Sequence, residues 1–190
     1  MRTFLFLLAV SSVAACGRAD DATEVPNTKV VVAVEPAPRS DAEIAGFLAA
    51  ANKGEIAAGK LAAERTTSSA VRVFAGQMVR EHEQTDTKAQ DVFEAARITP
   101  ASSDVARAVA ADGDGLVARM RGLEGLAFDR AYVDGQIAAH EEVLRRVDHE
   151  LLPGAQDAGL KAFLTELRPA LAAHLEHAKS VQQSLASSVP

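Results

Sequence analysis

Apolar residues recur at spacings of three and four along four stretches of the chain, the pattern of helices with one buried face. The four stretches cover approximately residues 41–65, 70–96, 126–152 and 157–185. Ser40, followed three residues later by Glu43, forms a capping-box pattern that predicts the start of the first helix. Pro153 predicts the end of the third helix. Pro169 predicts a kink in the fourth, because proline removes a backbone hydrogen bond.

The connections between these stretches predict the topology. A short polar turn at residues 66–69 makes the first two helices antiparallel neighbours. The connection 97–125 contains a helix of its own, from Ser103 to about Arg121, and is long enough to travel back along a bundle. We therefore expect an all-α fold: a ferritin-like four-helix bundle with an extra helix in the crossover between helices 2 and 3, which run parallel.

Composition agrees with a helical fold and narrows the classes of partner. The chain is rich in alanine, has no Trp and one Tyr, and carries a formal net charge of -6. Small side chains favour closely packed helices, and the negative charge argues against nucleic acid as a partner. After the N-terminus no stretch of 18 or more apolar residues predicts a membrane-spanning helix.

The first residues are typical of a targeting signal. Arg2 precedes an apolar run at residues 4–10, and the segment Val-Ala-Ala at residues 13–15 directly precedes Cys16. This resembles a bacterial lipoprotein signal with its lipobox, which implies cleavage after residue 15 and lipid on the Cys16 sulfur. Gly17, by the same resemblance, favours the outer membrane. The alternative is an ordinary secretory signal with a chance cysteine.

The predicted domain organisation follows from the targeting signal and the helical pattern. Residues 1–15 form the lipoprotein signal peptide, residues 16–39 the lipidated cysteine and a flexible tether, and residues 40–187 the helical bundle. The β-prone run 30–34 fits a plain linker, a transient strand or a partner contact. We expect the protein on the periplasmic face of a bacterial membrane, where its lipid anchor holds it. An envelope protein is a candidate partner there.

One polar residue interrupts each apolar stripe near its midpoint: Glu55, His82, His140 and His174. Midpoints keep the same height whichever way a helix runs, so the four side chains should meet at one level of the core. Three imidazoles and a carboxylate are suitable ligands for one transition-metal ion, Zn, Cu, Ni or Fe. The alternative is a metal-free network of buried hydrogen bonds, with Glu55 bonded to His140 for example.

Further polar residues lie close to these four in the sequence. Asp86 is one turn beyond His82, and His177 is one turn beyond His174, so each is a candidate to join or orient the metal ligands. Partial exposure to solvent is the alternative for both. Glu81 and the other acidic residues beside the histidines are expected to face water or neighbouring helices.

The sequence lacks the motifs of several classes of enzyme. The Glu-x-x-His pairs of di-iron bundles are absent, because the residues three before the core histidines are Val79, Ile137 and Leu171. No Ser/His/Asp pattern, phosphate-binding glycine loop or cysteine metal motif occurs. The sequence therefore favours metal binding, or a non-catalytic interaction role in the envelope, over catalysis.

Motifs in each long helix carry a family resemblance. They lie at residues 55–62, 74–82, 128–134, 140–141 and 167–179, and the segment Phe-Asp-Arg-Ala-Tyr at 128–132 is the most specific. Together they resemble the exported bacterial family called domain of unknown function 4142, whose members are often labelled outer-membrane proteins. The resemblance covers about residues 41–186 and implies a ferritin-like fold in the cell envelope. It implies no reaction, since the activity of the family is not established.

Overall fold

The computed structural model describes residues 37–38 and 40–187, which are almost entirely helical. The elements are α1 (Asp41–Arg65), α2 (Ser69–Ala96), α3 (Asp104–Arg121), α4 (Gly125–Arg146), the π-helical segment η1 (Val147–Leu151), the single turn α5 (Leu152–Gly154) and α6 (Ala158–Ser187). No strand occurs among the described residues, which confirms the predicted all-α class. The predicted signal peptide, Cys16 and residues 30–34 lie outside this part of the chain.

Serine side chains start three of the helices. The hydroxyls of Ser40, Ser68 and Ser103 each accept a hydrogen bond from the backbone N–H three residues later, at the starts of α1, α2 and α3. Such caps satisfy amide groups that have no partner within the helix. The caps at Ser40 and Ser103 are those that the sequence predicts.

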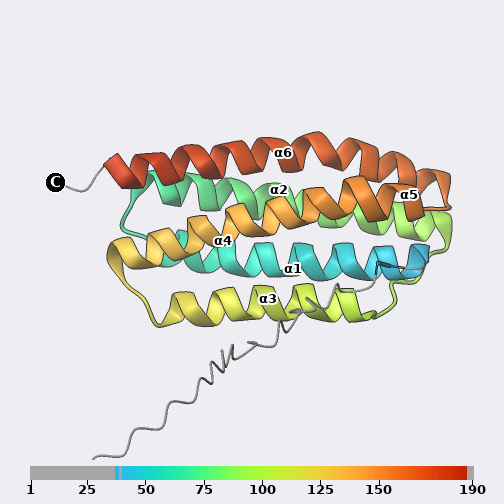
Figure 1. Cartoon of the computed structure of the whole chain (residues 1–190), viewed down its shortest axis with the longest axis horizontal. Coiled ribbons are helices and arrows are strands. Elements are labelled where there is room, and N and C mark those ends of the chain that lie inside the picture. The colour runs from blue at the N-terminus through green and yellow to red at the C-terminus, as the bar shows by residue number, and fades with distance from the viewer. Residues whose placement is uncertain (1–36, 39, 188–190) are drawn as a thin grey trace, which may run out of the picture. The chain divides into compact units, whose positions relative to one another are not determined.

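The crossover between α2 and α4 is also present. In Figure 1, α2 and α4 run in one direction, whereas α1, α3 and α6 run in the other. Helix α1 packs mainly against α2 and α3, and α6 packs against α4 and α2, so α3 lies outside the four-helix core. This confirms the predicted bundle with a parallel pair joined through an extra helix.

Two glycine contacts hold the crossover against α1. A Cβ atom on Gly46 would lie 1.9 Å from the carbonyl oxygen of Ala101, so only glycine lets this loop approach. The Ala101 N–H donates to the Ala42 carbonyl at 2.8 Å in the same contact. Further along, a Cβ on Gly113 of α3 would lie 3.1 Å from the Cα of Gly54, which shows how closely the two helices pass.

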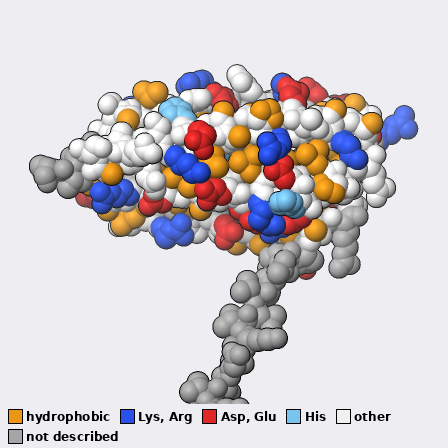
Figure 2. All heavy atoms as spheres, turned by 45° about the horizontal axis from the view of Figure 1, so that its top comes forward, with side chains coloured by type: hydrophobic (Ala, Val, Ile, Leu, Met, Phe, Trp, Pro, Cys, Tyr) orange, Lys and Arg blue, Asp and Glu red, His pale blue; other side chains and the backbone are white. Residues whose placement is uncertain are grey.

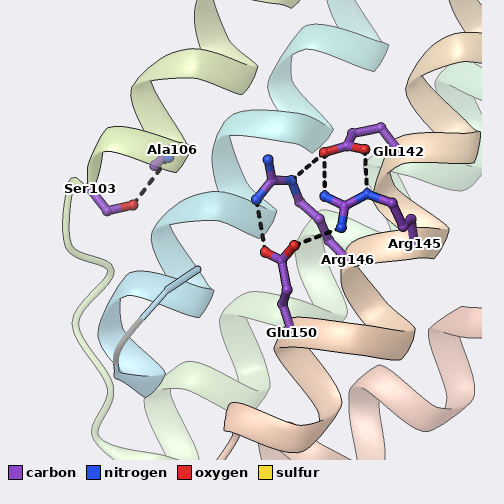
Figure 3. Close-up of polar contacts among 6 residues, drawn as sticks. All are labelled: Ser103, Ala106, Glu142, Arg145, Arg146 and Glu150. Atoms are coloured by element: carbon purple, nitrogen blue, oxygen red, sulfur yellow. Dashed lines mark hydrogen bonds and ion pairs between the residues drawn. The ribbon is translucent and has the colours of Figure 1, made fainter. Parts of the chain in front are cut away.

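The helix predicted for residues 126–152 contains a π-helical turn that its spacing did not indicate. Ion pairs join this turn to the end of α4 in Figure 3, where Arg146 bonds Glu142 at 2.6 Å and Glu150 at 2.8 Å. Arg145 pairs with the same two carboxylates. The guanidinium of Arg146 also lies 5.8 Å from the ring centre of Phe47, a cation–π contact. These contacts hold the chain where the wider turn changes the helical register.

The buried core consists of two apolar clusters, one toward each end of the bundle. The first includes Ile44, Phe47, Phe93, Leu151 and Leu164. The second includes Phe74, Met78, Met120, Tyr132 and Val181. The three core histidines fall between the two clusters along α2, α4 and α6. A polar layer therefore divides the core.

The surface mixes charges of both signs. Figure 2 shows acidic and basic side chains interspersed with apolar ones on the face in view. Exposed ion pairs such as Lys60–Glu83, at 2.8 Å, contribute about 0–1 kcal/mol each. Within the described residues, no helix combines the length and hydropathy needed to cross a membrane.

Candidate metal centre

Three histidines from three helices meet in the polar layer. His82 of α2, His140 of α4 and His174 of α6 are all buried, and each offers a ring nitrogen within 4.8 Å of the other two. Their ring centres lie 5.3–5.7 Å apart. The structure thus brings together the three histidines that their central positions in the helices predict to meet.

The tautomer of His82 follows from its contacts with Asn52 of α1. The side-chain amide of Asn52 donates to the backbone carbonyl of His82 at 2.8 Å, which fixes its Oδ1 toward the ring. That oxygen lies 2.7 Å from His82 Nδ1 and can only accept, so Nδ1 carries the proton. Consequently Nε2 has a free lone pair, and this buried atom has no hydrogen-bond partner.

The other two histidines are oriented in the same way. His140 Nδ1 lies 2.9 Å from the backbone carbonyl of Gln136, which can only accept, so the Nε2 of His140 is unprotonated. His174 Nε2 lies 2.5 Å from the carboxylate of Glu81, and donation to this group leaves the Nδ1 of His174 unprotonated. An amide, a carbonyl and a carboxylate thus hold the outer nitrogens of the three rings.

The inner nitrogens therefore all present lone pairs to one another. His140 Nε2 and His174 Nδ1 lie 3.3 Å apart with no proton between them in these tautomers. Two facing acceptors repel each other unless a proton or a cation lies between them. Metal-binding histidines in proteins have this arrangement, because a second group fixes the outer N–H and directs the inner nitrogen at the ion.

Burial favours the neutral form of two of these rings, His82 and His174. Loss of solvation, together with the smaller effects of the neighbouring His140 and His174, lowers the pKa of His82 from 6.5 to about 3. Burial also lowers the pKa of His174, although its hydrogen bond to Glu81 opposes the shift. Burial acts to raise the pKa of Glu81, but hydrogen bonds from His174 and Gln77 outweigh it and the pKa falls. Neutral His82 and His174 rings beside an ionised Glu81 carboxylate are protonation states that favour metal binding.

Glu55, the fourth predicted ligand, lies beside the histidines on α1. Its carboxylate accepts a hydrogen bond of 2.5 Å from Gln136 Nε2. Burial raises the pKa of Glu55, while the nearby His140 and the bond from Gln136 oppose the rise. The nitrogen cluster itself is formed by the three histidines, and Glu55 borders the cavity that His82 and His140 also line. Its ligation remains a prediction.

The two predicted outer residues have other contacts. Asp86 accepts a hydrogen bond from Gln90 at 2.8 Å and lines the same cavity. The ring of His177 packs edge-on against Phe74, with ring centres 4.9 Å apart. Both side chains are half-buried, which agrees with the alternative of partial exposure.

The residues that orient the histidines are different ones. Asn52 lies one turn before Glu55 on α1, and Gln136 lies one turn before His140 on α4. Each continues a buried stripe, so its helical position was a usable signal. Glu81 was expected to face water or a neighbouring helix. It bonds a histidine of the neighbouring helix α6, a contact that requires knowing which helices are adjacent.

Comparison with known proteins supports the family resemblance. The family model described as Domain of unknown function (DUF4142) matches residues 28–181. No curated protein and no solved structure matches the chain. The match includes all three histidines and Glu55.

Proposed function

Because the chain belongs to the DUF4142 family, which carries no described function, we propose from its own geometry that it binds one transition-metal ion. The ligands are His82 Nε2, His140 Nε2 and His174 Nδ1. Zinc, copper, nickel and ferrous iron all accept imidazole ligands of this kind. Glu55, the fourth predicted ligand, borders the same site.

One observation carries this proposal: the outer nitrogen of every ring is bound by an acceptor. Three ring nitrogens with free lone pairs therefore meet at a buried point. His82 Nε2 has no hydrogen-bond partner there, and buried polar atoms usually have one. A bound cation would satisfy all three nitrogens at once.

The competing function is an interaction role in the envelope, with the centre serving only as a buried network. The separation of 3.3 Å between His140 and His174 also fits a hydrogen bond if one ring gains a proton. The lowered pKa of His174 opposes that gain. Metal binding and a metal-free network therefore differ in what an added ion does to stability.

Melting curves of the purified full chain separate the two functions. Metal that binds only the folded state stabilises it by about 2.7 kcal/mol at a hundredfold excess over Kd. Each kcal/mol shifts the melting temperature of a domain of this size by roughly 2–4 °C. Added zinc or copper should therefore raise it by about 5–11 °C, and EDTA should reverse the rise.

Two histidine variants complete this test. His140→Leu should abolish the response to metal, because it removes a ligand. His149→Leu makes the same change at an exposed position in η1 and should respond like the wild type. Equal wild-type curves with zinc, copper and EDTA would contradict metal binding and support the buried network.

For cellular location, we propose a lipid anchor at Cys16 on the periplasmic face of a bacterial membrane, most simply the outer membrane. The lipobox-like segment before Cys16 supports this proposal. A centre built in an anchored bundle suits storage, delivery or sensing of metal in the envelope.

A further inference from the structure

A small cavity lies directly beside the histidine cluster. Its volume is about 40 Å³, and its walls come from α1, α2, α4 and α6. His82 and His140 both contribute to its lining. An ion held by the cluster would therefore have this cavity next to two of its ligands.

The walls of the cavity are mainly apolar. Leu48, Ala89, Phe163, Leu167 and Leu171 form much of the lining. Thr85, Asp86, Asn52 and Glu55 make the rest of the lining partly polar. Such walls favour a small ligand with a weakly held hydration shell.

The volume limits the size of that ligand. One water-sized sphere needs roughly 10–15 Å³ on this scale, so the cavity holds about three atoms of that size. Diatomic gases and small linear anions fit within this space. A five-membered ring such as imidazole does not.

The position of Glu55 bears on how many ligands the protein itself supplies. Gln136 Nε2 donates to one oxygen of the Glu55 carboxylate at 2.5 Å, and the cluster of ligand atoms that lie within 4.8 Å of one another comes from the three histidines without Glu55. Three protein ligands and one open position are the usual arrangement of metal centres that bind an external molecule.

We infer that the metal centre keeps one coordination position open toward this cavity and binds there an external ligand of about two or three atoms. This inference rests on the proposed function, since it requires the bound ion. It adds the class of molecule that the centre recognises.

The test uses copper(II) and azide on the purified full chain. Elemental analysis first establishes the copper content, which tests the proposed function separately. Azide should then produce a charge-transfer absorption band and change the copper electron paramagnetic resonance spectrum. Imidazole at the same concentration should change neither spectrum.

Two alanine variants locate the ligand. Ala89→Leu should weaken azide binding roughly tenfold, because the larger side chain occupies the space that azide needs. Its copper content should not change. Ala95→Leu makes the same substitution at an exposed position of α2 and should bind azide like the wild type. Leu167→Ala enlarges the cavity at a half-buried position and should admit imidazole, which covers the case that Ala89→Leu does not fold.

Each outcome decides a different claim. Stoichiometric copper without an azide response would overturn the open position and would favour Glu55 as the fourth ligand. An azide response unchanged in Ala89→Leu, or imidazole excluded from Leu167→Ala, would overturn the assignment to this cavity. A chain that binds no copper would overturn both the metal centre and the inference built on it.

Discussion

The three core histidines differ in the groups that hold them, and each difference has its own consequence. Asn52 contacts His82 twice, through its amide nitrogen and its oxygen, and so fixes both the backbone and the ring. Gln136 contributes a backbone carbonyl to His140 and a side-chain amide to Glu55. A change of the Asn52 side chain should therefore alter metal affinity without removing a ligand, whereas the carbonyl of residue 136 persists in any side-chain variant.

Asn52 gives the most direct prediction of this kind. Asn52→Ala removes the acceptor of the His82 Nδ1–H, so the ring loses its orientation and metal affinity should fall about 10–100-fold. Asn52→Asp keeps an acceptor at this position and should retain most of the affinity. Titration with a competing chelator measures both. Equal affinity in wild type and Asn52→Ala would show that Asn52 does not position the ligand.

His82 also predicts how the metal-free protein responds to acid. Its pKa is about 3 when folded and near 6.5 when unfolded, so the unfolded chain binds the proton more readily. Stability from this group is complete above pH 6.5 and falls as the pH drops toward 3. At pH 5 the loss should be about 2 kcal/mol, which corresponds to roughly 1.5 pH units.

Urea unfolding in EDTA at pH 7.5 and pH 5 measures this loss. His82→Gln has no titrating ring and should lose about 2 kcal/mol less than the wild type over the same interval. The exposed His149→Gln variant should follow the wild type. Identical pH dependence in wild type and His82→Gln would mean that His82 is not the group responsible.

Among the elements, the long helices and the crossover were predictable because both depend on local patterns. Apolar periodicity, serine caps and the length of the 97–125 connection predict the five main helices and the parallel pair. The π-helical turn was not predictable, because the apolar spacing of residues 126–152 is that of an α-helix, and the packing of Arg146 against Phe47 of another helix is not visible in the sequence.

The candidate site was likewise predictable only in part. Three histidines in the middle of apolar stripes could be found from spacing alone. Their orientation could not, because the contacts of Asn52 with His82 and of Glu81 with His174 join residues far apart in sequence. The expectation that Glu81 faces water or a neighbouring helix left its partner open, because helical periodicity does not identify adjacent helices.

Two glycines provide an element-scale prediction with opposite signs. Gly46→Ala places a Cβ against the Ala101 carbonyl, so the crossover loop must move, and stability should fall by about 1–3 kcal/mol. Gly115→Ala, in α3, meets no atom within 4 Å. It should stabilise the protein by up to about 1 kcal/mol, because alanine favours helix. Chemical unfolding of both variants measures the difference, and a stable Gly46→Ala variant would contradict the close loop contact.

At the scale of the whole molecule, the polar layer lowers the stability of the fold, and burial of the apolar clusters on either side must offset this loss. Buried imidazoles without full hydrogen bonding reduce stability, whereas a bound ion would convert the same layer into a link between α2, α4 and α6. Metal binding would therefore act on the bundle as a whole, since each ligand comes from a different helix.

The last prediction concerns how the whole chain is attached in the cell. Cys16 is the only cysteine, so Cys16→Ser removes the single thiol that a lipid could modify. Cells grown with labelled fatty acid should incorporate the label into the wild-type protein and not into Cys16→Ser. The variant should then appear in the soluble periplasmic fraction, because it lacks the proposed site of lipid attachment. An unlabelled wild-type protein would exclude the anchor, and equal membrane retention of both forms would indicate attachment through a protein partner instead.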